Sequence, residues 1–385
     1  MKCTGVNVFT GHPIEVRFRE TILSADDLVD AHAVSDIFIA PGFIDVQVNG
    51  FAGADFNDPE TPGELMAHSL QAIFSTGVTR LYPTIITGSE ARITGSLRNL
   101  FKAKRDLPTG DAIEGFHVEG PSISVEDGPR GAHPARWVRK PDIEEFKRWQ
   151  QAAEGHVRLI TIAAEWPEAP RYIEHVTGEG VVVSIGHTAA NGAQIRDCVS
   201  AGASMSTHLG NGAHAVMPRH PNYLWEQLAE DRLTATFIVD GIHIGEAFLK
   251  VALRAKSLER AVLITDAVMP AQCAPGPYRI GEVEVELLPP GDRVVLRGGT
   301  RLAGSALSMH DAIANVIRMT GIKLREAVTL VTTNAARAGR IAGRQRNFSP
   351  GERADFVRFQ MREGRLHILD TWVSGKCVFA SEPRP

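Results

Sequence analysis

The chain has 385 residues, which is long enough for a large domain with a smaller one appended. Apolar residues make up 43% of the chain and charged residues 22%, as in ordinary globular proteins. The formal net charge of −4 means that no basic surface argues for nucleic-acid or membrane binding.

The sequence shows no targeting or membrane-spanning segment. Its first residues lack the apolar core of a signal peptide, and no run approaches the roughly 20 apolar residues of a membrane-spanning helix. Cys3, Cys198, Cys273 and Cys377 are scattered, which is typical of reduced thiols rather than of a disulfide framework. We therefore expect a cytoplasmic enzyme.

From residue 41 onward, short apolar runs alternate with longer helical stretches. The expected strands are 42–48, 80–85, 112–118, 158–163, 180–185, 203–207, 235–239 and 261–264. The expected helices between them include 62–75, 141–154, 192–201 and 245–256. Strand–helix alternation implies parallel strands with helical crossovers, and about eight such units predict a (β/α)8 TIM-type barrel of the α/β class.

The two ends of the chain are richer in short extended runs than in helical patterns. We expect residues 1–40 and 345–385 to form one small β-sandwich-like domain, beside a catalytic barrel over 41–344. A segment around 278–298, with Pro289-Pro290-Gly291-Asp292 in its middle, predicts a β-hairpin inserted after the last barrel strand.

Potential metal ligands follow several of the expected strands. Glu119, His187 and His208 end three different strands, and the carboxyl ends of barrel strands meet at one mouth. One carboxylate and two imidazoles suit Zn²⁺ and leave a position open for water. Asp266 ends the eighth strand, where a carboxylate can move protons between water and a leaving nitrogen. The bland alternatives are histidines that cap loops and an aspartate that caps a helix.

With these residues assembled, the sequence resembles the amidohydrolase superfamily and, within it, the N-acetylglucosamine-6-phosphate deacetylase family. The matching motifs are Pro41-Gly42-Phe43-Ile44-Asp45-Val46-Gln47-Val48-Asn49-Gly50, His117-Val118-Glu119-Gly120-Pro121, Gly131-Ala132-His133, Gly186-His187-Thr188, Thr207-His208-Leu209, Val239-Asp240-Gly241-Ile242-His243, Thr265-Asp266-Ala267 and Leu302-Ala303-Gly304-Ser305. They occur in family order from about residue 41 to 310.

The resemblance implies hydrolysis of an N-acetyl amino sugar 6-phosphate to the free amine and acetate, usually by a homodimer. It implies that Glu119, His187 and His208 bind the metal and that Asp266 is the catalytic base and acid. Substrate contacts implied by the same motifs come from His133, Asn211, Gly212, Arg219 and His243. Of these, Arg219 and the backbone near Asn211 and Gly212 would hold the phosphate, since an arginine fork suits a phosphate dianion.

The first strand bears on the number of metal ions. Many amidohydrolases carry His-x-His there and use it for a second metal, whereas this chain has Gln47 and Asn49, whose neutral amides are poor ligands. We therefore expect one divalent metal ion per subunit, most simply zinc, with Gln47 and Asn49 in the pocket wall.

Several assignments stay open at the level of sequence. The loop after His208 departs from the family pattern, so another epimer or an unphosphorylated N-acyl sugar is an alternative substrate. His117, His214 and His220 are either site residues or packing residues. Two rival classes are another barrel amidase or deaminase, and a non-catalytic binding protein that has lost its chemistry.

Overall fold

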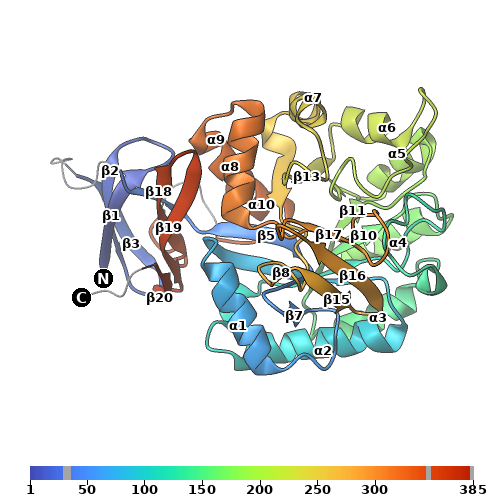
Figure 1. The fold of residues 1–385 in the computed structure, drawn as a ribbon, viewed down its shortest axis with the longest axis horizontal. Coiled ribbons are helices and arrows are strands. Elements are labelled where there is room, and N and C mark those ends of the chain that lie inside the picture. The colour runs from blue at the N-terminus through green and yellow to red at the C-terminus, as the bar shows by residue number, and fades with distance from the viewer. Residues whose placement is uncertain (29–35, 344–347, 382–385) are drawn as a thin grey trace.

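The computed structural model describes residues 1–28, 36–343 and 348–381. Its largest element is a parallel sheet of eight strands, with helices packed around it (Figure 1). In chain order these strands are β5 (Phe43–Val48), β8 (Val78–Ile86), β9 (Phe116–Glu119), β10 (Val157–Ile162), β11 (Val182–Ile185), β12 (Met205–Ser206), β13 (Thr234–Ile238) and β14 (Ala261–Ile264). Each strand pairs with the next one in the chain, and a bridge from Val48 to Ala267 brings the last strand end back to the first. The predicted barrel is thus confirmed.

Ten α-helices lie in the described part of the chain. They are α1 (Gly63–Phe74), α2 (Glu90–Asp106), α3 (Ile143–Ala152), α4 (Ala169–Gly178), α5 (Gly192–Ser200), α6 (Tyr223–Ala229), α7 (Glu246–Lys256), α8 (Met309–Thr320), α9 (Leu324–Leu330) and α10 (Thr333–Ala338). Local sequence sets several of their starts: the Asp142 side chain accepts backbone N–H groups at the start of α3, and Asn191 and Gln194 form a capping box on α5. None of these helices has the length and apolar character that crossing a membrane requires.

The two ends of the chain contribute strands to one seven-stranded sheet, which Figure 1 shows as blue and red strands side by side. The strands are β1 (Lys2–Asn7), β2 (Pro13–Phe18), β3 (Ile22–Asp27), β4 (Phe38–Pro41), β18 (Phe356–Arg362), β19 (Arg365–Val373) and β20 (Lys376–Ala380). Three strands separate β2 from β19 in the sheet order, yet the rings of Phe18 and Trp372 are 5.0 Å apart. The sheet therefore curls over its own apolar core, which gives the expected sandwich-like form. The expected boundary between 344 and 345 lies outside the described residues.

The segment expected to be a hairpin forms three antiparallel strands, β15 (Gly276–Ile280), β16 (Val283–Leu288) and β17 (Arg293–Leu296). An additional tight turn after β15 accounts for the difference. Gly281 has a φ of 57°, which glycine adopts without strain, so the chain reverses there as well as at the Pro-Pro-Gly-Asp turn. This three-stranded unit, called the insertion sheet below, packs its own apolar cluster against the barrel.

Candidate metal centre and active site

Three strand ends bring Glu119, His187 and His208 to one point, as the sequence predicted. His208 Nε2 lies 3.0 Å from Glu119 Oε1 and 3.1 Å from His187 Nε2. His187 Nε2 lies 3.3 Å from the same Glu119 oxygen. All three side chains are buried. Three facing N and O atoms from separate strands are a suitable donor set for a divalent cation.

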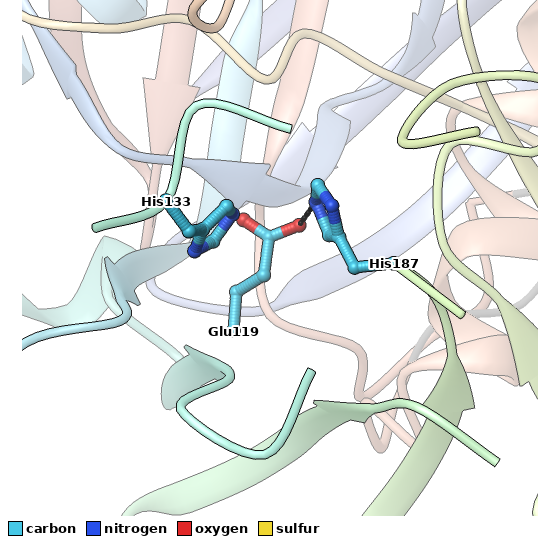
Figure 2. A group of neighbouring side chains, drawn as sticks. All are labelled: Glu119, His133 and His187. Carbon is cyan, nitrogen blue, oxygen red and sulfur yellow. Dashed lines mark ion pairs between the residues drawn. The ribbon is translucent and has the colours of Figure 1, made fainter. Parts of the chain in front are cut away.

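A second, overlapping trio replaces His208 with His133. One ligand atom each of Glu119, His133 and His187 lies within 4.8 Å of the other two. Figure 2 shows the Glu119 carboxylate between the two imidazole rings. The geometry thus places three imidazoles around one carboxylate, and the hydrogen bonds of His133 and His187 distinguish the roles of these two rings.

The hydrogen bonds of His133 and His187 point to different roles. His187 Nδ1 lies 2.7 Å from the carbonyl oxygen of Pro129, which can only accept, so Nδ1 carries the proton and Nε2 keeps its lone pair. The backbone N–H of Thr87 donates to His133 Nδ1, so the proton of His133 is on Nε2. His187 is therefore ready to ligate a metal, whereas His133 is a hydrogen-bond donor toward the cavity. For this reason we favour His208 over His133 as the third ligand.

Backbone conformation and close packing hold these groups in place. His187, His208 and Asp266 have φ angles of 49°, 31° and 49°, in the left-handed region that side chains other than glycine seldom adopt. Gly212 packs on the His187 ring so closely that a Cβ there would lie 2.6 Å from Nδ1. A Cβ at Gly131 would likewise lie 3.0 Å from Cε1 of the same ring. Strained strand ends and glycine contacts are typical of positions at which side-chain orientation matters for function.

Asp266 faces the trio and is held by the two amides of the first strand. Asn49 donates to Asp266 Oδ1 at 2.6 Å and Gln47 donates to the same oxygen at 3.1 Å. The Gln47 amide also donates to Glu119 Oε1 at 3.0 Å. Burial, followed by the charge of Glu119, raises the pKa of Asp266 to about 7. The two amides thus orient the carboxylates, and Asp266 is poised to gain or lose a proton near neutral pH.

Burial and neighbouring charges set the protonation of the other site groups. Burial alone would raise the pKa of Glu119, but the adjacent imidazoles of His187 and His208 hold it well below its usual range. Burial lowers the pKa of His133 to about 3 and that of His117 to about 4. The cluster thus combines an ionised carboxylate with neutral imidazole rings at His133 and His117.

A cavity of about 440 Å³ opens above the cluster. Of the predicted substrate residues, His133, Asn211, Gly212 and His243 line it, together with Asn49 and Asp266. Gln47 lies just behind the wall in contact with Glu119. Arg219 is exposed and is not part of this lining. A single chain therefore brings the candidate metal ligands and most of the predicted substrate residues to one cavity, but not Arg219.

The three histidines that the sequence left unassigned, His117, His214 and His220, lie in three different environments. His214 lines the cavity and lies 3.0 Å from the Tyr223 hydroxyl and 3.1 Å from a Glu126 oxygen. His117 is buried beneath the cluster, with Nε2 2.8 Å from Thr161 Oγ1. His220 is exposed and lies outside the cavity lining.

The structure also reveals cavity residues that the sequence reasoning did not single out. Arg301 lines the mouth and forms two hydrogen bonds, of 2.7 and 2.8 Å, with the Asp127 carboxylate. His243 Nδ1 lies 2.5 Å from Asp240 Oδ2, which orients the ring. Asp240 and His243 lie in a loop between β13 and α7, where the i, i+3 spacing of a helix gives no sequence signal for the pair. Nothing local in the sequence indicates that Arg301 and Asp127 meet.

Residues 38–378 match the model of the amidohydrolase family. The chain belongs to the amidohydrolase family. This amidohydrolase is 32% identical over 357 residues to the N-acetylglucosamine-6-phosphate deacetylase of Bacillus subtilis (strain 168), covering 92% of this chain and 87% of the relative. It is 29% identical over 340 residues to the N-acetylgalactosamine-6-phosphate deacetylase of Escherichia coli O157:H7, covering 88% and 87%.

Among solved structures, the amidohydrolase is similar to a mutant N-acetyl-D-glucosamine-6-phosphate deacetylase from Mycobacterium smegmatis in complex with N-acetyl-D-glucosamine-6-phosphate. The TM-score is 0.88 at 27% identity, and the match covers 98% of this chain and 99% of that one. Because almost the whole length of both chains superposes, the terminal sheet as well as the barrel belongs to the shared fold.

Proposed function

We propose that the protein is a metal-dependent hydrolase that converts N-acetylglucosamine 6-phosphate and water to glucosamine 6-phosphate and acetate. The observation that carries the proposal is the cluster of Glu119, His187 and His208 facing Asp266 across one cavity. The relatives with the same fold are named for this reaction, which gives the substrate class. The three proposed ligands and the Asp266 carboxylate are all present, which argues against the alternative of a non-catalytic barrel.

We propose Glu119 Oε1, His187 Nε2 and His208 Nε2 as the ligands of a single divalent ion, with zinc as the metal. The fit rests on the short separations of these atoms and on the free Nε2 lone pair of His187. Such an ion supplies Lewis acidity, which polarises an amide carbonyl and lowers the pKa of water. Gln47 and Asn49 donate amide N–H groups to carboxylates here, which supports one ion rather than two.

Asp266 would perform both proton transfers. Its carboxylate accepts a proton from the attacking water as the oxygen adds to the amide carbon, and then donates that proton to the nitrogen as the C–N bond breaks. The products are a free amine and a carboxylate. Because Asn49 and Gln47 both bond Oδ1, the carboxylate keeps one orientation throughout.

The remaining cavity residues would position the substrate. The protonated Nε2 of His133 can donate to the carbonyl oxygen, where negative charge develops as water adds. His243, oriented by Asp240, and Asn211 line the cavity and offer hydrogen bonds to sugar hydroxyls. Gly212 would contribute backbone contacts while it packs on His187.

We further propose a homodimer in which Arg219 reaches the phosphate in the cavity of the partner subunit. Arg219 is exposed outside its own cavity lining, in a loop where Val216 is 89% exposed and lines the cavity rim. An exposed aliphatic side chain beside a cation suits a subunit contact. Because a sugar phosphate does not readily cross a membrane, we also propose that the enzyme acts in the cytoplasm.

The decisive assay is acetate release from N-acetylglucosamine 6-phosphate, its galacto epimer and unphosphorylated N-acetylglucosamine, with and without a chelator. We expect turnover of the gluco phosphate, loss of turnover on chelation and recovery with zinc. Preference for the galacto epimer would reassign the sugar, and equal turnover with and without phosphate would remove the phosphate from the proposal.

The arginine is tested with the same substrates. Arg219→Ala should lower kcat/KM for the phosphorylated sugar by about a hundredfold, because a charge-assisted arginine fork contributes on the order of 3 kcal/mol. Arg105→Ala, at an exposed arginine of α2 that pairs with Asp106, is the matched control and should leave kcat/KM unchanged. An unaltered kcat/KM for Arg219→Ala would contradict the assignment.

A further inference from the structure

The cavity above the cluster has two chemically different halves. One half is lined by polar groups of the loops after β12 and β13, including Asn211, His214 and His243. The other half is lined by aliphatic side chains: Ile86, Val268, Ile280, Val283, Val285 and Leu302. These six residues are called the apolar wall below. Sugar hydroxyls placed against such a wall would leave water without gaining hydrogen-bond partners, so the wall favours an apolar part of the substrate.

The apolar wall is built by the insertion sheet, the end of β8, the loop after β14 and the segment after β17. Ile280, Val283 and Val285 come from β15 and β16, and Val285 is fully buried in the apolar cluster of that sheet. Val283 and Val285 share one face of β16, whereas Glu284 points to the other face and is exposed. Two strands of the insertion sheet thus contribute apolar side chains to the cavity lining.

The apolar wall adjoins the groups proposed to act on the amide. Val268 lies two residues after Asp266, and Ala132, which directly precedes His133, packs on the same apolar cluster. The amide of a bound substrate would therefore lie between the polar half and the wall. With the amino sugar in the polar half, the acyl group points toward the wall. Ile86, Val283 and Leu302 are partly exposed, whereas Val268, Ile280 and Val285 are buried. A single acetyl methyl group needs less surface than three partly exposed aliphatic side chains provide.

We propose that the apolar wall is an acyl subsite that accepts straight N-acyl chains of three and four carbons on the amino sugar. The inference rests on the proposed function and deepens it by naming the acyl group. The reaction is unchanged: water adds to the amide carbon, the C–N bond breaks, the proton passes to the nitrogen, and propanoate or butanoate leaves instead of acetate. The free amine is the same product for every chain length.

The test measures kcat/KM for the N-acetyl, N-propanoyl and N-butanoyl forms of glucosamine 6-phosphate by amine release with the metal-loaded enzyme. We expect kcat/KM to rise about fourfold with each added methylene, which is the factor that burying one CH₂ group contributes. A kcat/KM for the butanoyl form at or below that for the acetyl form would overturn the subsite. Failure to cleave any of the three amides would refute the proposed function as well.

A substitution within the apolar wall tests whether the acyl chain of the substrate lies against it. Val283→Phe adds a ring on the cavity face of β16 and should reduce kcat/KM for the butanoyl substrate at least tenfold, while the acetyl substrate changes less than threefold. Glu284→Phe adds the same ring on the exposed face of the same strand and should alter neither value. Equal losses for both substrates in Val283→Phe would show that the wall does not contact the acyl chain.

A second variant keeps the result interpretable if the added ring disturbs folding. Val283→Ala shortens a side chain of the wall and so enlarges the space for the acyl chain. The preferred acyl chain should then be one carbon longer, which is measured with the N-pentanoyl substrate. The proposal would be overturned if kcat/KM, relative to the N-acetyl substrate, rises for a butyl glycoside of the N-acetyl sugar but not for the N-butanoyl amide. That result would place the anomeric side of the sugar against the wall.

Discussion

The contact between Gly212 and His187 gives a sharp prediction about the metal centre. In Gly212→Ala the new Cβ would lie 2.6 Å from His187 Nδ1, whereas ordinary van der Waals contacts begin near 3.4 Å. The ring, the loop or both must move apart by about 0.8 Å. The φ of 56° at this position adds about 1–2 kcal/mol of backbone strain for a residue with a Cβ.

The displacement should affect metal binding and catalysis together. His187 is held by the bond from Nδ1 to Pro129, so a moved ring either loses that bond or swings Nε2 away from Glu119. Because a misplacement of about 1 Å can cost about a hundredfold in rate, we expect kcat/KM to fall by about that factor. Zinc content after dialysis against a weak chelator should fall as well. Both quantities are measured on the same preparations, by acetate release and by elemental analysis.

The matched control separates the clash from backbone strain. Gly180→Ala carries the same kind of strain, at a φ of 84°, but a Cβ there would meet no atom within 4 Å. It should lower the thermal midpoint slightly and leave zinc content and kcat/KM unchanged. If Gly212→Ala retains full zinc content and activity, the packing does not hold His187 in place and the reasoning is refuted.

Three further predictions concern Asp266, Arg80 and Asp45. Asp266→Asn keeps an oxygen for the Asn49 and Gln47 amides, so zinc content should stay normal while kcat/KM falls at least a thousandfold; retained activity would show that Asp266 is not the base. Arg80→Met breaks the buried pair with Asp355 at 2.7 Å, but Asp355 keeps its pair with Arg353 at 2.7 Å, so the fold should lose about 2 kcal/mol in thermal or denaturant unfolding. Loss of an exposed pair costs at most about 1 kcal/mol, and equal losses would contradict the burial argument. Burial raises the pKa of Asp45 to about 7, so its contribution to stability is complete below the unfolded pKa and is lost as pH rises through 7. Relative to the parent, Asp45→Asn should therefore gain thermal stability between pH 5 and 8, and a difference that does not vary with pH would argue against the raised pKa.

The sequence indicated the elements and strand ends well because both depend on local pattern. Strands of a parallel barrel are buried on both faces and appear as continuous apolar runs, as in β5, whose six residues are all buried. The residue after such a run must face the barrel mouth, which is why Glu119, His187, His208 and Asp266 could be selected together. The boundaries were less accurate where a turn intervenes: 112–118 was expected as a strand, but β9 begins only at Phe116.

Contacts between distant residues required the tertiary structure. The role of His133 as a donor depends on the Thr87 backbone, 46 residues away, and the pairing of Arg301 with Asp127 joins loops 174 residues apart. The position of Arg219 outside the cavity likewise depends on the path of its loop. Loop paths follow from packing against neighbouring elements rather than from local sequence, so residue type and spacing alone do not specify them.

The sequence by itself thus determined which side chains stand at the mouth of the barrel and the chemistry that they can perform. Strand periodicity and residue type are local properties, and they are enough to bring together two carboxylates and two imidazoles. Only the tertiary structure decided which nitrogen of His187 is free, which glycine packs on His187, and that apolar side chains of the insertion sheet line the cavity. These features arise where separate segments meet, and long-range packing sets their geometry.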